Sequence, residues 1–219
     1  MSSELIKRIL TSMAIFPLSI FFVFQGGYLL LSFLLAIFFI ANYELFSVFK
    51  KISNILFLDL VLILALFSIY YLAENSLWLL LWVIILVICS DIGGYVFGKI
   101  FKWKKLTKIS PKKTVSGVLG SFIFSLLSVF IIQLIIEILY PPAYSLKDNF
   151  LIPEFFFLAI VFSLVAQAGD LTISYFKRLE KIKDVGKILP GHGGIFDRID
   201  GLIFVVIVTF IFYKLHFIP

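Results

Sequence analysis

The stretch SLWLLLWVIILVICSDIGGYVFG, residues 76–98, combines a long apolar run with one acidic residue near its end. A helix needs about 20 mostly apolar residues to cross the hydrocarbon core of a bilayer, and this stretch has that length. Similar runs recur along the chain, which has 219 residues and is 62% hydrophobic. A β-barrel would instead show short segments of alternating hydrophobicity. The sequence therefore predicts an all-α, polytopic integral membrane helical bundle.

About seven transmembrane helices account for the apolar runs, which short polar, glycine or proline breaks separate. The predicted spans are 9–25, 28–48, 54–73, 76–98, 115–139, 153–178 and 201–218. We interpret the first span as an uncleaved helix, because no small-residue cleavage site follows it and further spans come directly after. The chain is expected to form a single membrane domain.

Basic residues gather on one side of these spans. If the N-terminus lies in the cytoplasm, all of the 19 lysines and arginines except Lys147 and Lys214 fall in cytoplasmic segments. Cytoplasmic loops of membrane proteins carry such an excess, so we expect the N-terminus inside and the C-terminus outside. The formal net charge of +6 suits loops beside anionic lipid head groups and requires no nucleic-acid partner.

One acidic residue lies inside the fourth span. Asp91 precedes Lys99 by eight residues, which places it about 12 Å below the cytoplasmic boundary. An ionised carboxylate at that depth is costly unless it faces a cavity or a cation, so Asp91 is a candidate site residue. The alternative is an Asp that caps or pairs within the bundle. Gly94 and Gly98 form a small-residue pair that favours close helix packing.

The segment SPKKT, residues 110–114, precedes the fifth span. Ser110 is a possible helix cap, and Pro111 suits a turn or the first helical position. Lys112 and Lys113 add positive charge beside a helix N-terminus, a combination that suits a phosphate group. A plain basic loop next to the membrane is the alternative.

Polar residues recur at helical spacing along the sixth span and form one stripe. The carboxylate lies deepest, the hydroxyl follows, and the ammonium groups come nearest to the cytoplasmic surface. This order suits a metal ion held deep and phosphates held nearer the surface. The stripe comprises Gln167, Asp170, Ser174, Lys177 and Lys181.

The segment KDVGKILPGHGGIFDRIDG, residues 183–201, is rich in glycine and charge between two apolar runs. Glycines permit positive φ and close backbone approach, so this loop can present N–H groups to an anion. Asp197 could converge with Asp170 on one divalent cation, and Mg²⁺ prefers such hard oxygen ligands. His192 is either a turn residue or a group that binds substrate or handles a proton. The implied chemistry is metal-assisted work on phosphates.

The segment SYFKRLEKIKDVGKILPGHGGIFDRID, residues 174–200, resembles the signature of the phosphatidate cytidylyltransferases, also called CDP-diacylglycerol synthases. The segments SDIGGYVFGK, 90–99, and KISPKKTVSG, 108–117, are similar to the family's two upstream blocks. The resemblance covers about residues 85–215. The matching signature positions are Ser174, Lys177, Arg178, Lys183, Asp184, Gly186, Leu189, Pro190, His192, Gly193, Gly194, Asp197, Arg198 and Asp200.

The resemblance implies that CTP and phosphatidate react to CDP-diacylglycerol and pyrophosphate, a step of phospholipid biosynthesis. It implies that Asp170 and Asp197 hold Mg²⁺, with room for a second cation such as K⁺, and that Ser174 and Lys177 join them as catalytic residues. It further implies a homodimer in a bacterial-type inner membrane, with residues 1–80 as N-terminal helices and 81–219 as the catalytic core. The implied substrate-binding residues are Asp91, Ser110, Lys112, Lys113, Arg178, Lys183, Asp184, His192, Gly193, Gly194 and Arg198.

Two other classes of function stay open at this point. A CTP-dependent kinase, or a cytidylyltransferase that acts on another membrane lipid, would share the acidic and basic blocks, although the full match over residues 174–200 argues against a kinase. A non-enzymatic binder of anionic lipid would need the basic loops but not the pair Asp170 and Asp197.

Overall fold

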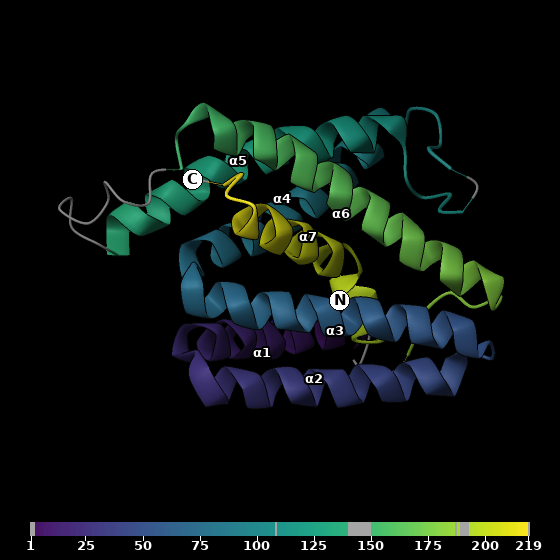
Figure 1. Cartoon of the computed structure of the whole chain (residues 1–219). Helices are drawn as coiled ribbons and strands as arrows, with labels where there is room; N and C mark the ends of the chain where they lie inside the picture. Colours follow the sequence, from purple (N-terminus) through teal and green to yellow (C-terminus); the bar gives the residue numbers. More distant parts are fainter. Residues whose placement is uncertain (1–2, 108, 140–149, 187, 189–192, 219) are drawn as a thin grey trace.

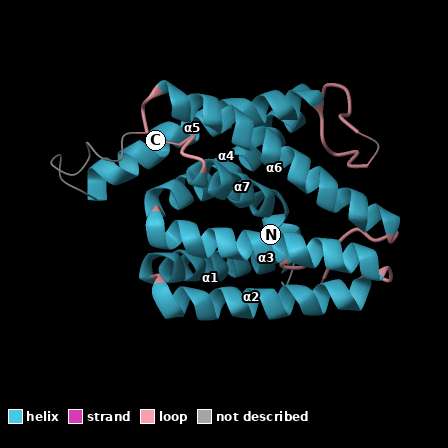
Figure 2. Ribbon diagram, in the orientation of Figure 1, coloured by secondary structure: helices cyan, strands magenta, loops and turns pink. Residues whose placement is uncertain are grey.

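The structure, a computed structural model, describes residues 3–107, 109–139, 150–186, 188 and 193–218, and gives only the backbone of 3–12 and 14. This part of the chain is helical and contains no strand (Figure 2); Lys105 and Thr114 form an isolated antiparallel bridge. The predicted all-α bundle is confirmed. Its helices are α1 (Ser3–Gln25), α2 (Gly27–Val48), α3 (Ile52–Asn75), α4 (Leu77–Phe101), α5 (Val115–Leu139), α6 (Pro153–Leu179) and α7 (Phe196–Lys214).

Five of these helices, α2 to α6, are long and apolar enough to cross a membrane. The bounds predicted for the last span, 201–218, are wrong, because α7 begins at Phe196 and ends at Lys214. Its first turn includes Asp197, whose negative charge is favourable at a helix N-terminus, so the helix starts before the apolar run. At the other end, His216 has φ of 57° and lies outside the helix. That α1 and α7 also cross the membrane stays a prediction.

The helices form two groups that meet along α3 and α7. Figure 1 shows α1, α2 and α3 side by side in the lower part of the view, with α4 to α7 above them. Helix α3 packs against α7, and α7 in turn packs against α6 and α4. The connection from α2 to α3, the connection from α4 to α5 and the end of α6 all lie at the right-hand end of the bundle in Figure 1. This end holds most of the charged residues that the sequence singled out.

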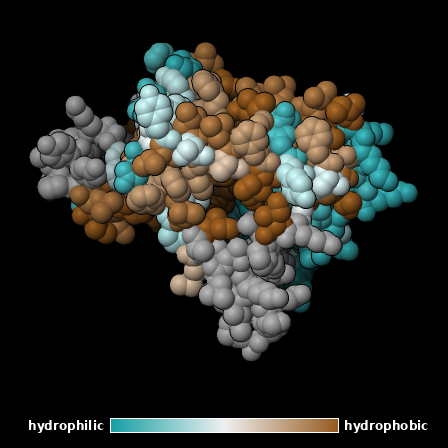
Figure 3. Space-filling model, turned by 90° about the horizontal axis from the view of Figure 1, so that it is seen from below, coloured by the Kyte–Doolittle hydropathy of each residue, from teal (hydrophilic) through white to brown (hydrophobic). Residues whose placement is uncertain are grey.

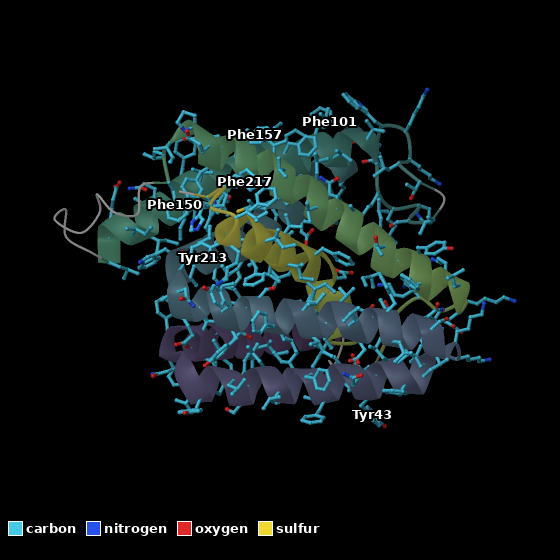
Figure 4. All side chains as sticks on the ribbon, in the orientation of Figure 1. Tyr43, Phe101, Phe150, Phe157, Tyr213 and Phe217 are labelled. Atoms are coloured by element: carbon cyan, nitrogen blue, oxygen red, sulfur yellow. The ribbon has the colours of Figure 1, made fainter. Side chains whose placement is uncertain are left out.

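Aromatic packing fixes the opposite half of the bundle. Trp82 of α4 is fully buried, with ring centroids 5.1 Å from Phe155 and 5.8 Å from Phe150; Phe150 is labelled in Figure 4. The indole Nε1–H donates to Ser128 Oγ at 3.1 Å, so the polar edge of the ring is satisfied. Outside this core, Figure 3 shows apolar side chains over much of the face seen from below, with the largest group of polar ones at the right-hand end and a smaller group at the upper left.

Helices α4 and α5 cross at glycines. A Cβ on Gly93 or on Gly120 would overlap the backbone oxygen of the other residue. A Cβ on Gly94 would lie 2.8 Å from Ser121 Oγ, and one on Gly98 would lie 3.0 Å from Thr114 Oγ1. Small residues let two backbones approach this closely, so the packing role predicted for Gly94 and Gly98 is confirmed. The crossing brings the Asp91 end of α4 next to the start of α5.

A second close crossing joins α6 and α7. Gly169 of α6 faces the ring of Phe204, and a Cβ on Gly201 of α7 would lie 3.2 Å from the backbone oxygen of Ala166. Each glycine is directly next to an acidic residue, Asp170 on α6 and Asp200 on α7. The crossing therefore brings the carboxylates of the two helices to the same region.

Candidate active site

A cavity of about 360 Å³ lies where α4, the α4–α5 connection, α6 and α7 meet. Its walls carry four carboxylates and two lysines, and Asp91 and Tyr95 share one wall, as their spacing on α4 predicts. The cavity therefore gathers residues from all three segments that resemble family motifs. Its lining consists of Asp91, Gly94, Tyr95, Ser110, Lys112, Lys113, Thr114, Gly117, Val118, Ser121, Gln167, Asp170, Asp197 and Asp200.

The α4–α5 connection folds back on itself before it enters α5. The backbone N–H of Leu106 donates to the Lys113 carbonyl at 2.8 Å, and that of Lys113 donates to the Ser110 carbonyl at 3.1 Å. The Ser110 cap prediction is wrong: Thr114 Oγ1 accepts from Gly117 N at 3.1 Å and caps α5. Ser110 lies in the turn before the helix, which leaves its side chain on the cavity wall.

Lys113 connects this loop to α6. Its Nζ lies 2.6 Å from Asp170 Oδ2 and donates to the Gln167 carbonyl at 3.3 Å. Ser174 Oγ donates to the other oxygen, Asp170 Oδ1, at 3.3 Å. The side chains of Lys113 and Asp170 are 23% and 30% exposed, so both groups of this pair remain open to the cavity.

Lys177 and Asp197 form a second ion pair that is more deeply buried. Lys177 Nζ lies 2.9 Å from Asp197 Oδ1 and 3.9 Å from Asp200 Oδ2. The side chains of Lys177 and Asp197 are only 9% and 4% exposed. Asp197 Oδ2 accepts from the backbone N–H of Val185 at 2.8 Å and of Gly194 at 3.0 Å. Three donors therefore fix the Asp197 carboxylate in one orientation.

The predicted polar stripe on α6 is confirmed over most of its length. Gln167 and Asp170 line the cavity, Ser174 bonds to Asp170, and Lys177 pairs with Asp197. Lys181 was wrongly included, because α6 ends at Leu179 and Lys181 is exposed with φ of 58°. The helical spacing that linked it to the stripe does not continue past the helix end.

Several signature residues lie outside the cavity wall. Arg178 donates to the backbone carbonyls of Ile109 at 3.4 Å and Ile182 at 2.7 Å, and so ties the α4–α5 and α6–α7 connections to the end of α6. Lys183 and Asp184 are exposed and do not line the cavity, and the exposed side chain of Arg198 is on the first turn of α7.

Gly193 and Gly194 of the predicted glycine-rich loop lie beside Asp197. Gly193 has φ of 89°, as the glycine-rich loop predicts, and packs against Asp184 and Asp197. The backbone N–H of Gly194 donates to Asp197 Oδ2. His192 lies outside the described residues.

Glu44 on α2 is not among the predicted site residues, yet it lies next to the site. This residue is 1% exposed, and its Oε2 accepts from the backbone N–H of Ile195 at 2.8 Å. Gly186 and Gly194 lie so close that a Cβ on either would overlap the Glu44 carboxyl group. A signal existed, because an acidic residue inside an apolar span is a functional candidate by default, and Glu44 lies within the predicted span 28–48.

The cavity acids have the chemistry of a site for a hard divalent cation. Within the described ranges, no group of three or more His, Cys, Asp or Glu residues is arranged to hold a metal ion by itself. Magnesium, however, is usually held by one or two carboxylates together with substrate phosphates and water. Asp170 and Asp197 on neighbouring helices supply carboxylates of that kind on one cavity wall. The donor set therefore fits Mg²⁺ only together with a phosphate ligand.

Comparison with known proteins agrees with the resemblance seen in the sequence. The model of the cytidylyltransferase family matches residues 51–216. A phosphatidate cytidylyltransferase of Helicobacter pylori is 37% identical over 141 residues, which are 64% of this chain and 48% of the relative. One of Staphylococcus saprophyticus is 36% identical over 138 residues, 63% of this chain and 49% of the relative.

A third relative, the phosphatidate cytidylyltransferase of Rickettsia conorii, is 40% identical over 139 residues, 59% of this chain and 57% of the relative. The chain thus spans about half the length of the curated relatives it matches. The family match covers most of the chain and contains every residue of the cavity wall. On these grounds the chain belongs to the cytidylyltransferase family.

Proposed function

We propose that this protein is a phosphatidate cytidylyltransferase of phospholipid biosynthesis. It transfers the cytidylyl group of CTP to phosphatidate and releases pyrophosphate, which yields CDP-diacylglycerol. The names of the relatives favour this activity and give no support to a lipid kinase or a non-enzymatic lipid binder. The observation that carries the proposal is the single cavity in which acids and lysines of three separate motifs meet.

The reaction needs charge neutralisation and alignment more than acid–base chemistry. An oxygen of the lipid phosphate attacks the α-phosphorus of CTP, and the bond to the β-phosphate oxygen breaks, so pyrophosphate leaves with that electron pair. The attacking oxygen is already largely ionised near neutral pH and requires no general base. Positioning and electrostatic stabilisation dominate such transfers. Lysine side chains on the cavity wall meet that requirement.

The residues of the cavity divide these tasks. Lys112 and Lys113 neutralise phosphate charge at the start of α5, where backbone N–H groups also point toward the cavity end of the helix. Ser174 and Lys177 of α6 do not line the cavity but contact its carboxylates Asp170 and Asp197, and they would bind phosphate oxygens from that position. Asp170 and Asp197 would hold Mg²⁺, which when bound polarises the phosphoryl oxygens and neutralises their charge. A second cation such as K⁺ belongs to this proposal, as does a homodimer.

The proposed orientation places this cavity at the cytoplasmic side of a bacterial inner membrane. The α2–α3 and α4–α5 connections and the end of α6, which carry most of the basic residues, lie at one end of the bundle, and the α4–α5 connection contributes Lys112 and Lys113 to the cavity. CTP is a cytoplasmic nucleotide with several negative charges, and basic loops beside the membrane attract such a ligand. Phosphatidate reaches the same end from the adjoining leaflet.

The test uses purified protein in detergent with phosphatidate, Mg²⁺ and CTP that carries label in either the α- or the γ-phosphate. Label from α-labelled CTP should enter the lipid, while γ-label should appear as pyrophosphate. Chelation of Mg²⁺ should abolish both. Transfer of γ-label to the lipid would mean a kinase. Absence of lipid label from a folded protein, with every acceptor lipid tried, would refute the proposal.

Matched variants assign the site. Asp170→Asn should lose most activity, because a neutral amide is a poor ligand for a hard cation. The control is Asp59→Asn on α3, an acidic residue whose carboxylate accepts from Asn42 Nδ2 at 2.9 Å and does not line the cavity. Equal loss in both variants, or full activity of Asp170→Asn at ordinary Mg²⁺, would contradict the assignment of Asp170.

A further inference from the structure

Glu44 is a buried acidic residue on a helix that does not line the cavity. Figure 4 shows its neighbour Tyr43 pointing away from the bundle, and Tyr43 is 70% exposed. One residue further along α2, the Glu44 side chain is 1% exposed and lies against the segment that precedes α7. A carboxylate is costly to bury unless it accepts hydrogen bonds, so its surroundings indicate its role.

The Glu44 carboxyl group touches both described ends of the segment between α6 and α7. On one side, the backbone N–H of Ile195 donates to Glu44 Oε2 at 2.8 Å. On the other side, Gly186 lies against Glu44 Oε1, and a Cβ there would overlap the carboxyl group. Gly194 lies against Oε2 and against the backbone nitrogen of Gly186. The carboxyl group therefore occupies the place where the two ends of the segment come together.

The same two ends hold the Asp197 carboxylate. Val185, next to Gly186, donates its backbone N–H to Asp197 Oδ2 at 2.8 Å, and Gly194, next to Ile195, donates at 3.0 Å. Val185 is fully buried. The contacts of the Glu44 carboxyl group with Gly186, Gly194 and Ile195 thus lie one residue from, or directly on, a donor to Asp197. The other Asp197 oxygen is left to face Lys177.

We propose that Glu44 is a positioning residue of the site: its buried carboxylate holds Val185–Gly186 and Gly194–Ile195 together, and so fixes the orientation of the Asp197 carboxylate. The inference rests on the proposed function only for its effect on turnover. It also explains why the segment has glycine at 186 and 194, since any larger residue would displace the carboxyl group. Helix α2 would thereby contribute to the site without reaching the cavity.

Amide hydrogen exchange of the full-length protein in detergent tests this role without any turnover. In Glu44→Leu, which keeps the bulk but removes the acceptor, exchange of the Val185, Gly194 and Ile195 amides should be about tenfold faster or more. Glu44→Gln should show a smaller change, because its side-chain carbonyl can still accept from Ile195. Amides of α4 and α5 should exchange as in the unmodified protein.

The matched control is Asn42→Leu, two residues earlier on α2. Asn42 is part-buried, and its Nδ2 donates to Asp59 on α3 and to the Phe38 carbonyl on α2, neither of which belongs to the α6–α7 segment. This variant should leave the exchange of the Val185, Gly194 and Ile195 amides unchanged. Faster exchange of these amides in Asn42→Leu, or equally faster exchange throughout the bundle in Glu44→Leu, would reduce Glu44 to a general packing residue and overturn the inference.

Turnover gives the second readout. The kcat per folded molecule of Glu44→Leu should fall about tenfold or more, since small displacements of reacting groups are that costly, and Glu44→Gln should recover much of it. Unchanged exchange in Glu44→Leu, or faster exchange with unchanged kcat, would overturn the positioning role. If the unmodified protein forms no labelled lipid while the exchange results hold, the proposed function fails and the structural link from Glu44 to Asp197 stands.

Discussion

The buried pair of Lys177 and Asp197 gives the sharpest energetic prediction. At an effective dielectric constant of about 20, two unit charges 2.9 Å apart attract by about 6 kcal/mol. Much of this attraction offsets the cost of taking both ions out of water, and removing one partner of a buried pair costs about 3–5 kcal/mol. In Lys177→Met, Asp197 keeps two backbone N–H donors. We therefore expect a loss of about 3 kcal/mol in the free energy of unfolding, at the lower end of that range.

The reverse change should cost less. In Asp197→Asn, Lys177 keeps a second carboxylate, Asp200 Oδ2, at 3.9 Å, so we expect a loss of about 2 kcal/mol. The double variant lacks both charges, so no charge is buried without a partner. Its loss in the free energy of unfolding should therefore be about 2 kcal/mol smaller than the sum of the two single losses.

The assay for this cycle is reversible unfolding in mixed detergent micelles, followed by circular dichroism for all four proteins. The control is Lys99→Met, an exposed lysine near the end of α4 whose ammonium group donates to the Tyr95 hydroxyl at 3.5 Å. It should change the free energy of unfolding by less than about 0.5 kcal/mol. Additive losses in the double variant would refute the reasoning, because they would mean that the two charges do not stabilise each other.

Three further outcomes follow from contacts elsewhere in the site and the bundle. Lys113→Met should raise the KM for CTP in the labelled-lipid assay, and an unchanged KM would mean that Lys113 does not bind CTP. The same variant should lower the free energy of unfolding by less than about 1 kcal/mol, because its partner Asp170 is partly solvated. Thr114→Val should cost about 1 kcal/mol in the same unfolding assay through loss of the α5 cap, whereas the half-buried control Thr172→Val, within α6, should not. Gly120→Ala should lower the free energy of unfolding by about 1–3 kcal/mol, because the added methyl group forces α4 and α5 apart. The exposed control Leu119→Ala should change it little. If Gly120→Ala is as stable as the unmodified protein, the crossing is not tightly packed.

The helices could be predicted from the sequence because each is a long apolar run that ends at polar residues or glycine. The predicted span 115–139 coincides with α5, and 153–178 differs from α6 by one residue. For α7 the same reasoning predicted the bounds of the apolar run, 201–218, rather than those of the helix, Phe196–Lys214. Its first turn is charged, and a hydropathy pattern detects only the apolar part of a helix.

Most residues of the candidate site could be predicted from the sequence, but the ion pairs between them could not. Helical spacing placed Asp170 and Lys177 on one face of α6, yet their partners Lys113 and Asp197 come from other segments. Such pairs depend on how helices cross, which local periodicity does not determine. The choice of Thr114 over Ser110 as the α5 cap depends on where the helix begins, and sequence-based boundaries carry errors of about 2–4 residues. The division into residues 1–80 and a catalytic core 81–219 stays a prediction.

The two lysine–carboxylate pairs have a consequence for how ligands would enter the cavity. An anion that draws Lys113 and Lys177 away leaves Asp170 and Asp197 without their partners, while a cation that binds those carboxylates leaves two ammonium groups unneutralised. Either ligand alone therefore breaks favourable contacts, whereas the two together restore charge balance. Binding of an anion and of a cation should then be positively cooperative, and thermodynamic linkage requires each to raise the affinity for the other by the same factor.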